Sequence, residues 1–428
     1  MTRALPVVFA AILALPLAAQ SPAPAPPAGG APAGRFAALD RVLQEHVDDG
    51  RLAGAVALVL QDGKPVYERA VGWSDKEAGR RMAPDTIFRI ASQTKAITSA
   101  AVLMLVEDGR MSLTEPVSRY LPEFAKATVV GQGGAVVPVK RPITIAHLLT
   151  HTAGISYGTE PAVAAAYEAK GLGPAAGYGW YTADKDEPIC DTMARLASLP
   201  FVAQPGEAYV YGYSTDVLGC VVEKVSGLPL DRFFREKITG PLGMRDTAFY
   251  LPSGQSDRLA TVYASVMDGP VVRAPAGARG QGHYAEGPRK SFAGGAGLLA
   301  TARDYARFLE MIRRGGTLDG VRILSPRGVR LMTTNQVGPL YDRASAPLWD
   351  FDGGRGFGMG FSTTDAYGAN GFEGEGGFGW GGAYGTVYRV DPALRAVLVL
   401  MLQQIPNRTD IRTRFQTLVY QALAEPVR

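Results

Sequence analysis

Apolar residues recur at two different spacings along the first quarter of the chain. Between residues 35 and 49 they lie three or four positions apart, as on one face of a helix, at Phe36, Leu39, Leu43 and Val47. Two strand-like runs follow at 54–60 and 65–72, joined across Asp62-Gly63, a dipeptide typical of tight hairpin turns. The pattern therefore predicts an amphipathic helix that is followed by a β-hairpin.

The rest of the chain changes character twice. Residues 95–107 (KAITSAAVLMLVE) are apolar on most faces, which predicts a buried central helix that ends near Gly109. From about 115 to 290, short helical pieces alternate with Pro- and Gly-rich loops and show no strand repeat. The last part predicts a helix, two strands and a final helix, at 302–313, 383–390, 396–402 and 409–423.

Strand patterns therefore lie near both ends of the chain, with helices and loops between them. The economical architecture is an α+β fold with one antiparallel sheet built from both ends, flanked by helices, and a helical lobe beside it. In residue numbers, we expect a sheet lobe from 36–115 and 295–428 and a helical lobe from 116–294.

The N-terminal residues resemble a targeting segment. Arg3 precedes an apolar stretch at 4–17, and Ala18-Ala19 offers a small-residue cleavage site, so 1–19 is predicted to be a signal peptide. Residues 20–35 are rich in Pro, Ala and Gly, as in an extended linker. We therefore expect a periplasmic or secreted protein with no membrane contact beyond the signal segment.

Charge and cysteine content narrow the possibilities. The formal net charge is only +4, without a long Lys/Arg run, which argues against a nucleic-acid partner. Cys190 and Cys220 are the two cysteines. Export would permit a disulfide between them, whereas the apolar helical surroundings of Cys220 are more typical of a buried free thiol, and the sequence leaves the question open.

Ser92-Gln93-Thr94-Lys95 opens the buried helix and is the one Ser-x-x-Lys in the chain. Residues three apart share a helix face, so the Lys95 amine can reach the Ser92 hydroxyl. Burial disfavours the charged form of a lysine, which makes Lys95 a usable proton acceptor for the serine. Taken alone, the motif is equally compatible with a serine that caps a helix beside an unrelated lysine.

A second candidate precedes another predicted helix. Tyr211 lies in the stretch 205–213 (PGEAYVYGY), after which Ser214 is expected to cap a helix that ends at Gly227. A tyrosine fixed at the start of such a helix can act as a general base if a nearby ammonium stabilises its phenolate.

With these motifs the chain resembles the β-lactamase-related serine hydrolases, which include class C β-lactamases, D-alanyl-D-alanine carboxypeptidases, D-aminopeptidases and family VIII carboxylesterases. The matching stretches are 88–95 (FRIASQTK), 113–124 (LTEPVSRYLPEF), 143–154 (ITIAHLLTHTAG), Tyr211 with 214–219 (STDVLG), 294–308 and Trp380-Gly381-Gly382. The resemblance implies a serine β-lactamase/DD-peptidase-like fold, a small-molecule ester or amide substrate, and no cofactor or metal; it says nothing of the oligomeric state.

The resemblance also implies roles for individual residues. It makes Ser92 the nucleophile, with Lys95 and Tyr211 as its catalytic partners. The oxyanion hole would be the backbone N–H groups of Ser92 and Ala383. Trp380, Gly381 and Gly382 would be the third motif, on a strand that lines the cleft.

Two departures from the family pattern bear on the substrate. The family often has Tyr-x-Asn where this chain has Tyr213 in the third position, and the β-lactamases have Lys-Thr-Gly where it has Trp380-Gly381-Gly382. That lysine helps hold a substrate carboxylate, so an indole in its place favours neutral esters. We expect Tyr213, Trp380, Gly381 and Gly382 to contact the substrate.

The leading hypothesis is therefore a carboxylesterase that cleaves short-chain esters through an acyl-enzyme. A β-lactamase, a D-Ala-D-Ala carboxypeptidase or D-aminopeptidase, and an acyltransferase remain alternatives within the enzymes. An alternative of another class is a penicillin-binding or acyl-binding protein that does not turn over.

Two further motifs are expected to have no catalytic role. Ser156 lies in Gly-x-Ser-x-Gly, but the elbow of α/β-hydrolases needs a strand before it, and residues 145–151 predict a helix. His147 and His151 lie four apart on that helix without an acidic residue in a metal-site pattern, so we interpret both as structural.

Overall fold

A large antiparallel sheet organises the protein, whose computed structural model describes residues 34–173, 184–267, 269–277, 280–345 and 353–423. Within these ranges the sheet has eight strands in the order β13-β14-β15-β16-β17-β1-β2-β3. Its strands are β1 (Gly54–Gln61), β2 (Lys64–Asp75), β3 (Arg80–Arg81), β13 (Arg355–Phe357), β14 (Ser362–Thr364), β15 (Phe378–Gly381), β16 (Val387–Asp391) and β17 (Ala396–Leu402). The α+β fold and the sheet built from both chain ends are confirmed.

The two ends of the chain meet where β1 pairs with β17. This pair is antiparallel, with Ala55 opposite Leu402 and Gln61 opposite Ala396. Both strands are almost wholly buried because helices cover both faces of the sheet. The hairpin of β1 and β2 turns at Asp62-Gly63, as predicted.

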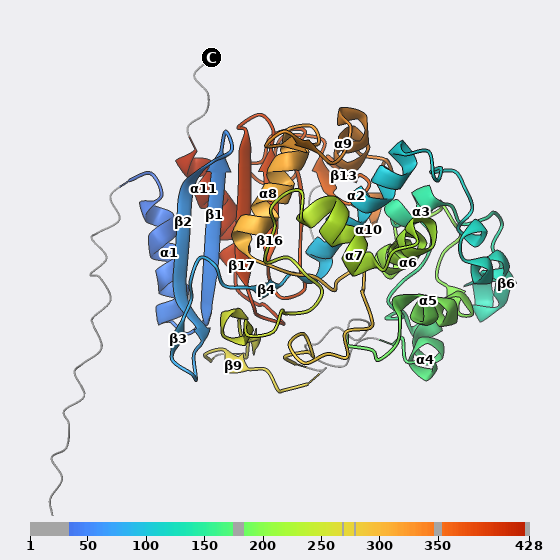
Figure 1. Cartoon of the computed structure of the whole chain (residues 1–428), viewed down its shortest axis with the longest axis horizontal. Coiled ribbons are helices and arrows are strands. Elements are labelled where there is room, and N and C mark those ends of the chain that lie inside the picture. The colour runs from blue at the N-terminus through green and yellow to red at the C-terminus, as the bar shows by residue number, and fades with distance from the viewer. Residues whose placement is uncertain (1–33, 174–183, 268, 278–279, 346–352, 424–428) are drawn as a thin grey trace, which may run out of the picture.

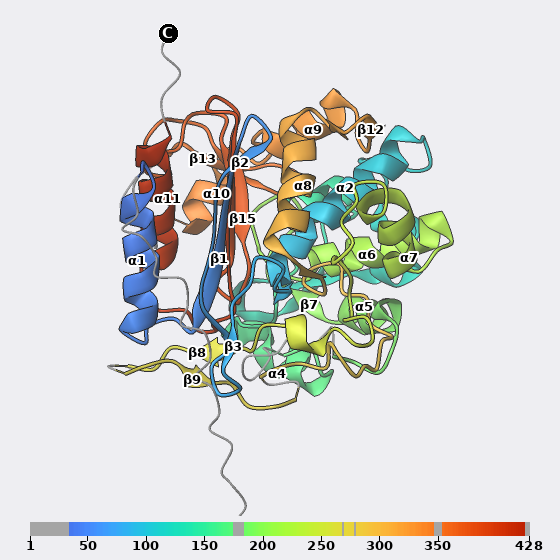
Figure 2. The same cartoon turned by 60° about the vertical axis from the view of Figure 1, so that its left-hand side comes forward.

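Helices form a layer on each face of the sheet (Figures 1 and 2). On one face, α1 (Ala37–Asp48) and α11 (Ile411–Ala422) pack side by side, and their apolar residues share a core with the sheet. On the other face lie α8 (Ala302–Arg313) and α2 (Thr94–Glu107), the buried central helix, of which only Met104, Val106 and Glu107 are not fully buried.

The helical part extends from α2 away from the sheet (Figure 1). It contains α3 (Ile145–Leu149), α4 (Pro161–Ala169), α5 (Ile189–Ala197), α6 (Ser214–Ser226) and α7 (Leu230–Phe234). Two further helices, α9 (Pro326–Thr333) and α10 (Leu340–Ser345), follow α8 in the chain. Helix α6 packs against α2, α3 and α5. Of the helices in the described residues, none has the length and apolar character needed to span a bilayer.

Short strands occur where the sequence showed no strand pattern. They are β4 (Phe88–Arg89), β5 (Thr128–Val130), β6 (Val136–Pro138), β7 (Pro200–Phe201), β8 (Tyr263–Ala264), β9 (Val272–Arg273), β10 (Leu299–Ala300), β11 (Thr317–Leu318) and β12 (Val321–Arg322). They are two or three residues long, too short to produce a period-two alternation that a sequence could reveal.

Two local predictions are wrong. Ser214 is the first residue of α6 rather than its cap: Tyr213 occupies the cap position, and its carbonyl accepts from the N–H groups of Asp216 and Val217. Strand β16 begins at Val387 instead of 383, because Gly385, with φ of +88°, turns the chain after β15. The signal peptide at 1–19 and almost all of the linker at 20–35 lie outside the described residues.

Candidate active site

Ser92 lies in a strained turn between β4 and α2. Strand β4 pairs with β10, and a short 3-10 turn, Ala91–Gln93, then leads directly into α2. Ala91 has φ of +43°, a left-handed conformation that non-glycine residues rarely adopt and that clusters at functional sites. Ser92 is 8% exposed and lines a cleft, so its hydroxyl is placed where a small molecule could reach it.

The Lys95 amine is held by three acceptors. Its Nζ lies 2.7 Å from the Gly295 carbonyl oxygen, 2.9 Å from the Tyr157 hydroxyl and 3.5 Å from Ser92 Oγ. An ammonium has three N–H donors, so this arrangement gives each of them an acceptor. Because Lys95 is 2% exposed, water does not compete for these positions.

Tyr211 meets Lys95 through its ring. The Lys95 ammonium is 4.7 Å from the centroid of the Tyr211 ring, a cation–π contact. The Tyr211 hydroxyl accepts a hydrogen bond from Trp380 Nε1 at 3.2 Å, and the two rings lie 5.4 Å apart. The structure thus brings together Ser92, Lys95, Tyr211 and Trp380, which the sequence places up to 288 positions apart.

The cleft has a volume of about 570 Å³ and lies between the turn at Ser92, the end of β15 and α11. Trp380, Gly381, Gly382 and Ala383 all line it. At position 382 a Cβ would lie 2.4 Å from the Ile90 carbonyl oxygen, so only glycine lets this strand end approach the turn before Ser92. The backbones of Ser92 and Ala383 therefore lie on the same cavity.

Tyr213 does not line this cleft, which corrects the expectation that it contacts the substrate. Its side chain is fully buried, and its hydroxyl donates to the Leu172 carbonyl oxygen at 3.0 Å. The backbone at 211–213 leads directly into α6, so successive side chains do not follow the alternation of an extended strand. Tyr213 packs instead behind Tyr157, with ring centroids 5.0 Å apart.

Tyr157 is a site residue that the sequence did not reveal. It lines the cleft and binds Lys95, yet it comes from the loop after Gly154, which has φ of +78°. No spacing relates it to Ser92 or Tyr211. Its neighbour Ser156, the alternative nucleophile, is fully buried and accepts from the Gly158 N–H at 3.0 Å, in a loop rather than an elbow.

A buried carboxyl group lies below Lys95. Asp216, in the first turn of α6, is fully buried and accepts from the Gly295 N–H at 3.0 Å. Burial raises the pKa of Asp216 to about 6, although the Lys95 charge works in the opposite direction. Gly295 thus binds Lys95 through its carbonyl and Asp216 through its N–H.

The two histidines on the segment 145–151 differ in their surroundings. His147 completes a capping box with Thr144 at the start of α3. His151 is 2% exposed, and its ring lies 4.8 Å from that of Tyr211. Burial, and then the Lys95 charge, lower the pKa of His151 well below its usual value. A neutral imidazole therefore backs the Tyr211 ring.

Three arginines lie on the cleft wall among the described residues: Arg355, Arg389 and Arg412. Arg389 pairs with the buried Glu373, and Arg355 pairs with Asp342 at 3.2 Å. Arg412, on α11, lies next to Gly381 and forms no ion pair with any residue in the described ranges. It is the cation of the cleft wall whose charge is least compensated.

Cys190 and Cys220 form a disulfide, with their Cα atoms 5.2 Å apart. This settles the question that the sequence left open, in favour of the bridge over a buried free thiol at Cys220. The bridge links α5 to α6 because the two helices pack against each other, a contact that the sequence does not encode. No group of three His, Cys, Asp or Glu side chains suited to a metal ion occurs in the described residues.

Comparisons with known proteins agree with this architecture. The Beta-lactamase family model matches residues 39–421. The chain is 37% identical over 390 residues to Protein Rv1367c of Mycobacterium tuberculosis, covering 85% of this chain and 89% of that protein. It is 35% identical over 379 residues to Esterase EstB of Burkholderia gladioli, with the same coverage of 85% and 89%.

A solved structure adds to these relatives. That of EstCE1, described as a hydrolase with promiscuous acyltransferase activity, aligns with a TM-score of 0.75 and 28% identity, covering 89% of this chain and 97% of that one.

Proposed function

The chain belongs to the Beta-lactamase family, and from this we propose that it is a serine hydrolase that cleaves neutral carboxylic esters through an acyl-enzyme at Ser92. The observation that carries the proposal is the meeting of Ser92, Tyr211 and Trp380 on one cleft, with the buried Lys95 in contact with Ser92 and Tyr211. The similarity to Esterase EstB supports ester hydrolysis as the reaction.

In the proposed first step, Ser92 Oγ attacks the ester carbonyl carbon and passes its proton to Tyr211. The Lys95 amine already has three neighbours within hydrogen-bond distance, the Gly295 carbonyl oxygen, the Tyr157 hydroxyl and Ser92 Oγ. We therefore assign the proton acceptor to Tyr211, whose phenolate the adjacent ammonium and the Trp380 N–H would stabilise.

The second step releases the alcohol. The tetrahedral oxyanion would bind the backbone N–H groups of Ser92 and Ala383, each worth about 3–4 kcal/mol by analogy with other oxyanion holes. As the C–O bond breaks, Tyr211 returns its proton to the leaving alkoxide. Water, activated by the same tyrosine, then attacks the acyl-enzyme and releases the carboxylic acid and free Ser92.

The Trp380 indole favours the binding of neutral substrates. Its indole, with Tyr211, Tyr341 and Tyr157, gives the cleft an aromatic wall next to Ser92. An apolar wall stabilises the acyl or alkyl part of an ester by burial, at roughly 25 cal/mol per Å² of apolar surface removed from water. We expect short acyl chains to suffice for turnover.

A turnover panel tests this proposal. Purified protein would be assayed with p-nitrophenyl esters of increasing acyl length, nitrocefin and a D-alanyl-D-alanine peptide. We expect release of p-nitrophenol from short-chain esters to dominate. Preferential hydrolysis of nitrocefin or the peptide would move the assignment to a β-lactamase or a peptidase. A stable acyl adduct on Ser92 without turnover would identify a binding protein.

Acyl transfer to an alcohol is a second candidate. The cleft, with a volume of about 570 Å³, has room for an acceptor alcohol in place of water beside the acyl-enzyme. The structurally similar EstCE1 is described as a hydrolase with promiscuous acyltransferase activity. Adding a primary alcohol to the ester assay and measuring the new ester by mass spectrometry distinguishes transfer from hydrolysis.

We also propose that the protein is exported. The disulfide between Cys190 and Cys220 supports this, since disulfides persist in oxidising compartments. Sequencing the N-terminus of protein recovered from the periplasm or medium should find cleavage after residue 19. Full-length protein confined to the cytoplasm would contradict it.

A further inference from the structure

A second cavity, of about 670 Å³, lies in the helical part of the protein. Its walls come from α7, the turn that follows it, and the segments 240–252 and 289–298. None of its lining residues also lines the Ser92 cleft, so the two are separate spaces. The proposed reaction gives this cavity no role.

The inner wall of the cavity is apolar and aromatic. Phe249 lies between Phe234 and Phe292, with ring centroids 5.4 Å apart on each side. Leu298 adds an aliphatic surface beside them. A planar or otherwise apolar body would be stabilised against this wall, since aromatic rings favour stacked or edge-to-face contacts with other rings.

The outer wall carries an excess of positive charge. Among the described residues that line the cavity, the cations are Arg235, Arg245 and Arg289 and the single acid is Asp231. Asp231 lies 3.8 Å from Arg235 and offsets that one charge. Arg289 donates to the carbonyl oxygens of Leu251 and Ala285 and forms no ion pair within the described ranges.

Arg245 is exposed and forms no ion pair with any described side chain. Charge complementarity therefore points to an anion at the cavity mouth, and guanidinium groups match the geometry of a carboxylate.

An unusual backbone borders the same cavity. Residues Arg235–Thr239 form a π-helical turn, a rare conformation that occurs often at functional sites. Arg289, which lines the same cavity, has φ of +61°, in the left-handed region. Both features turn arginine-bearing backbone toward one space.

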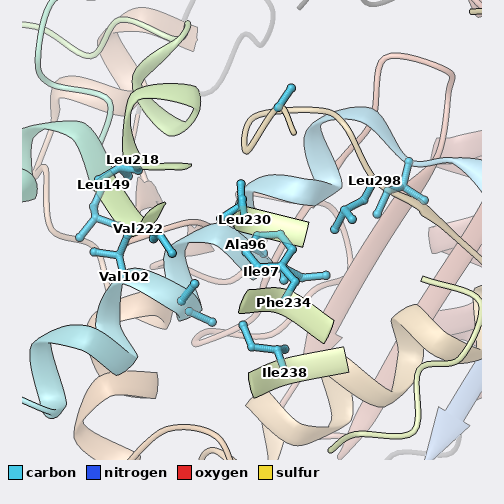
Figure 3. Close-up of a cluster of buried hydrophobic side chains, with 14 of the residues drawn as sticks. Ala96, Ile97, Val102, Leu149, Leu218, Val222, Leu230, Phe234, Ile238 and Leu298 are labelled. Carbon is cyan, nitrogen blue, oxygen red and sulfur yellow. The ribbon is translucent and has the colours of Figure 1, made fainter. Parts of the chain in front are cut away.

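The cavity wall is in contact with the catalytic helix. Figure 3 shows Phe234 and Leu298 in one cluster with Ala96 and Ile97 of α2, the two residues that follow Lys95. The Leu298 N–H donates to Thr94 Oγ1 at 3.0 Å. Three residues earlier, the Gly295 carbonyl binds Lys95 at 2.7 Å. The segment 295–298 thus has the cavity at one end and the Lys95 amine at the other.

We propose that this cavity binds a small carboxylic acid with an aromatic or other apolar body, and that its occupation alters turnover at Ser92. The carboxylate pairs with Arg245 and Arg289 at the mouth, and the apolar body packs on the half-buried Phe292, whose ring lies 5.4 Å from that of Phe249. Because these side chains pack on the segment that holds Lys95, an occupant that shifts them changes the position of the amine.

Calorimetric titration of the full chain with 3-phenylpropionate tests binding without relying on turnover. We expect saturable binding that weakens by roughly tenfold or more in Arg245→Gln, the size of a lost charged hydrogen bond. The neutral 3-phenylpropanamide should bind the wild type more weakly than 3-phenylpropionate does, by a similar factor. Arg322→Gln, an exposed arginine on β12, is the matched control and should leave affinity unchanged.

A cleft variant separates the two cavities. Arg412→Gln removes a cation from the Ser92 cleft, so affinity lost in Arg412→Gln and retained in Arg245→Gln would overturn the proposal in favour of product binding in the cleft. Absence of binding at millimolar acid would overturn it as well.

The coupling has its own measurement. With a neutral ester as substrate, saturating acid should change kcat at least threefold in the wild type and not in Arg245→Gln. Binding that leaves kcat and KM unchanged would overturn the coupling. Because binding is read by calorimetry, inactivity toward esters would contradict the proposed hydrolase and leave this site to be judged on its own.

Discussion

The Lys95 amine donates to the hydroxyl of Tyr157 at 2.9 Å, whereas it lies 4.7 Å from the Tyr211 ring centroid. Two tyrosines therefore contact one ammonium in different ways. The hydroxyl of Tyr157 holds the Lys95 amine in place. The ring of Tyr211 makes a cation–π contact with the same amine, while the Tyr211 hydroxyl accepts from Trp380 Nε1. This difference separates a positioning role from a proton-transfer role.

Three Tyr→Phe variants, measured side by side, test that separation. Tyr211→Phe should lower kcat/KM for an ester by roughly 10²–10⁴, the range for a lost general base. Tyr157→Phe removes one charged hydrogen bond of about 1.5–3 kcal/mol, so we expect a loss of roughly 10- to 100-fold. Tyr213→Phe should keep activity and lose about 1 kcal/mol of stability, because its hydroxyl donates to the Leu172 carbonyl oxygen and does not line the cleft.

The pattern of these losses decides the assignment. Near-wild-type activity in Tyr211→Phe, together with collapse in Tyr157→Phe, would transfer the base to Tyr157. Thermal unfolding of each variant controls for a change in folding.

The nucleophile is tested by paired serine variants. Ser92→Ala should abolish ester turnover with folding intact, whereas Ser156→Ala should stay within a few-fold of the wild type because Ser156 is buried outside the cleft. Intact-mass and peptide mass spectrometry after a fluorophosphonate probe should place the adduct on Ser92. An adduct on Ser156 would refute the assignment.

The preference for neutral over negatively charged substrates should depend on Trp380. The wild type should have a much higher kcat/KM for neutral short-chain esters than for penicillins or cephalosporins. Trp380→Lys should raise kcat/KM for a penicillin by roughly tenfold or more, since it introduces a charged partner for the substrate carboxylate. Trp380→Phe is the control, because it also removes the N–H that binds Tyr211 but adds no charge.

Efficient hydrolysis of cephalosporins by the wild type would show that another cation binds the carboxylate. Arg412 is then the residue to change, because it lines the cleft beside Gly381 and has no ion-pair partner in the described residues.

Long periodic segments were predictable from the sequence. The predicted helix 302–313 and strand 396–402 coincide with α8 and β17 residue for residue, since the helix has a clear amphipathic period and the strand is a continuous apolar run that is wholly buried. The candidates Ser92, Tyr211 and Trp380 do meet at one cleft, and Lys95 contacts the first two of them, because each was anchored to a helix start or a strand.

Contacts between loops were not predictable in the same way. Tyr157 reaches Lys95 and Gly295 reaches Asp216 through tertiary packing, for which neighbouring residues give no pattern. Tyr213 was misplaced for a related reason: the burial of its ring and its bond to Leu172 follow from how α6 packs, not from its spacing to Tyr211.

The disulfide should stabilise the helical part of the protein. Cys190 and Cys220 are 30 positions apart, and closing a loop of that length corresponds to about 3–4 kcal/mol by the chain-entropy model. The double variant Cys190→Ala/Cys220→Ala should therefore unfold at a lower denaturant midpoint. A reductant should lower the midpoint of the wild type toward that value and leave the double variant unchanged; an equal midpoint for all three would contradict a stabilising bridge.

Asp216 should make stability depend on pH in a defined window. Its folded-state pKa of about 6 lies above the ordinary value of 3.8, so the folded protein binds this proton more tightly than the unfolded chain does. The stabilisation is complete below about pH 4 and is lost as the pH rises through about 6, a change of about 3 kcal/mol for a shift of roughly two units.

Asp216→Asn keeps an acceptor for the Gly295 N–H and has no carboxyl to titrate. The free energy of unfolding of the wild type, measured in urea from pH 4 to pH 7.5, should fall by about 2–3 kcal/mol more than that of Asp216→Asn over the same interval, since part of the change lies below pH 4. Asp319→Asn, an exposed carboxyl near Arg307, is the matched control and should follow the wild type. Parallel curves for the wild type and Asp216→Asn would mean that Asp216 is ionised without cost, and that the Lys95 charge compensates its burial in full.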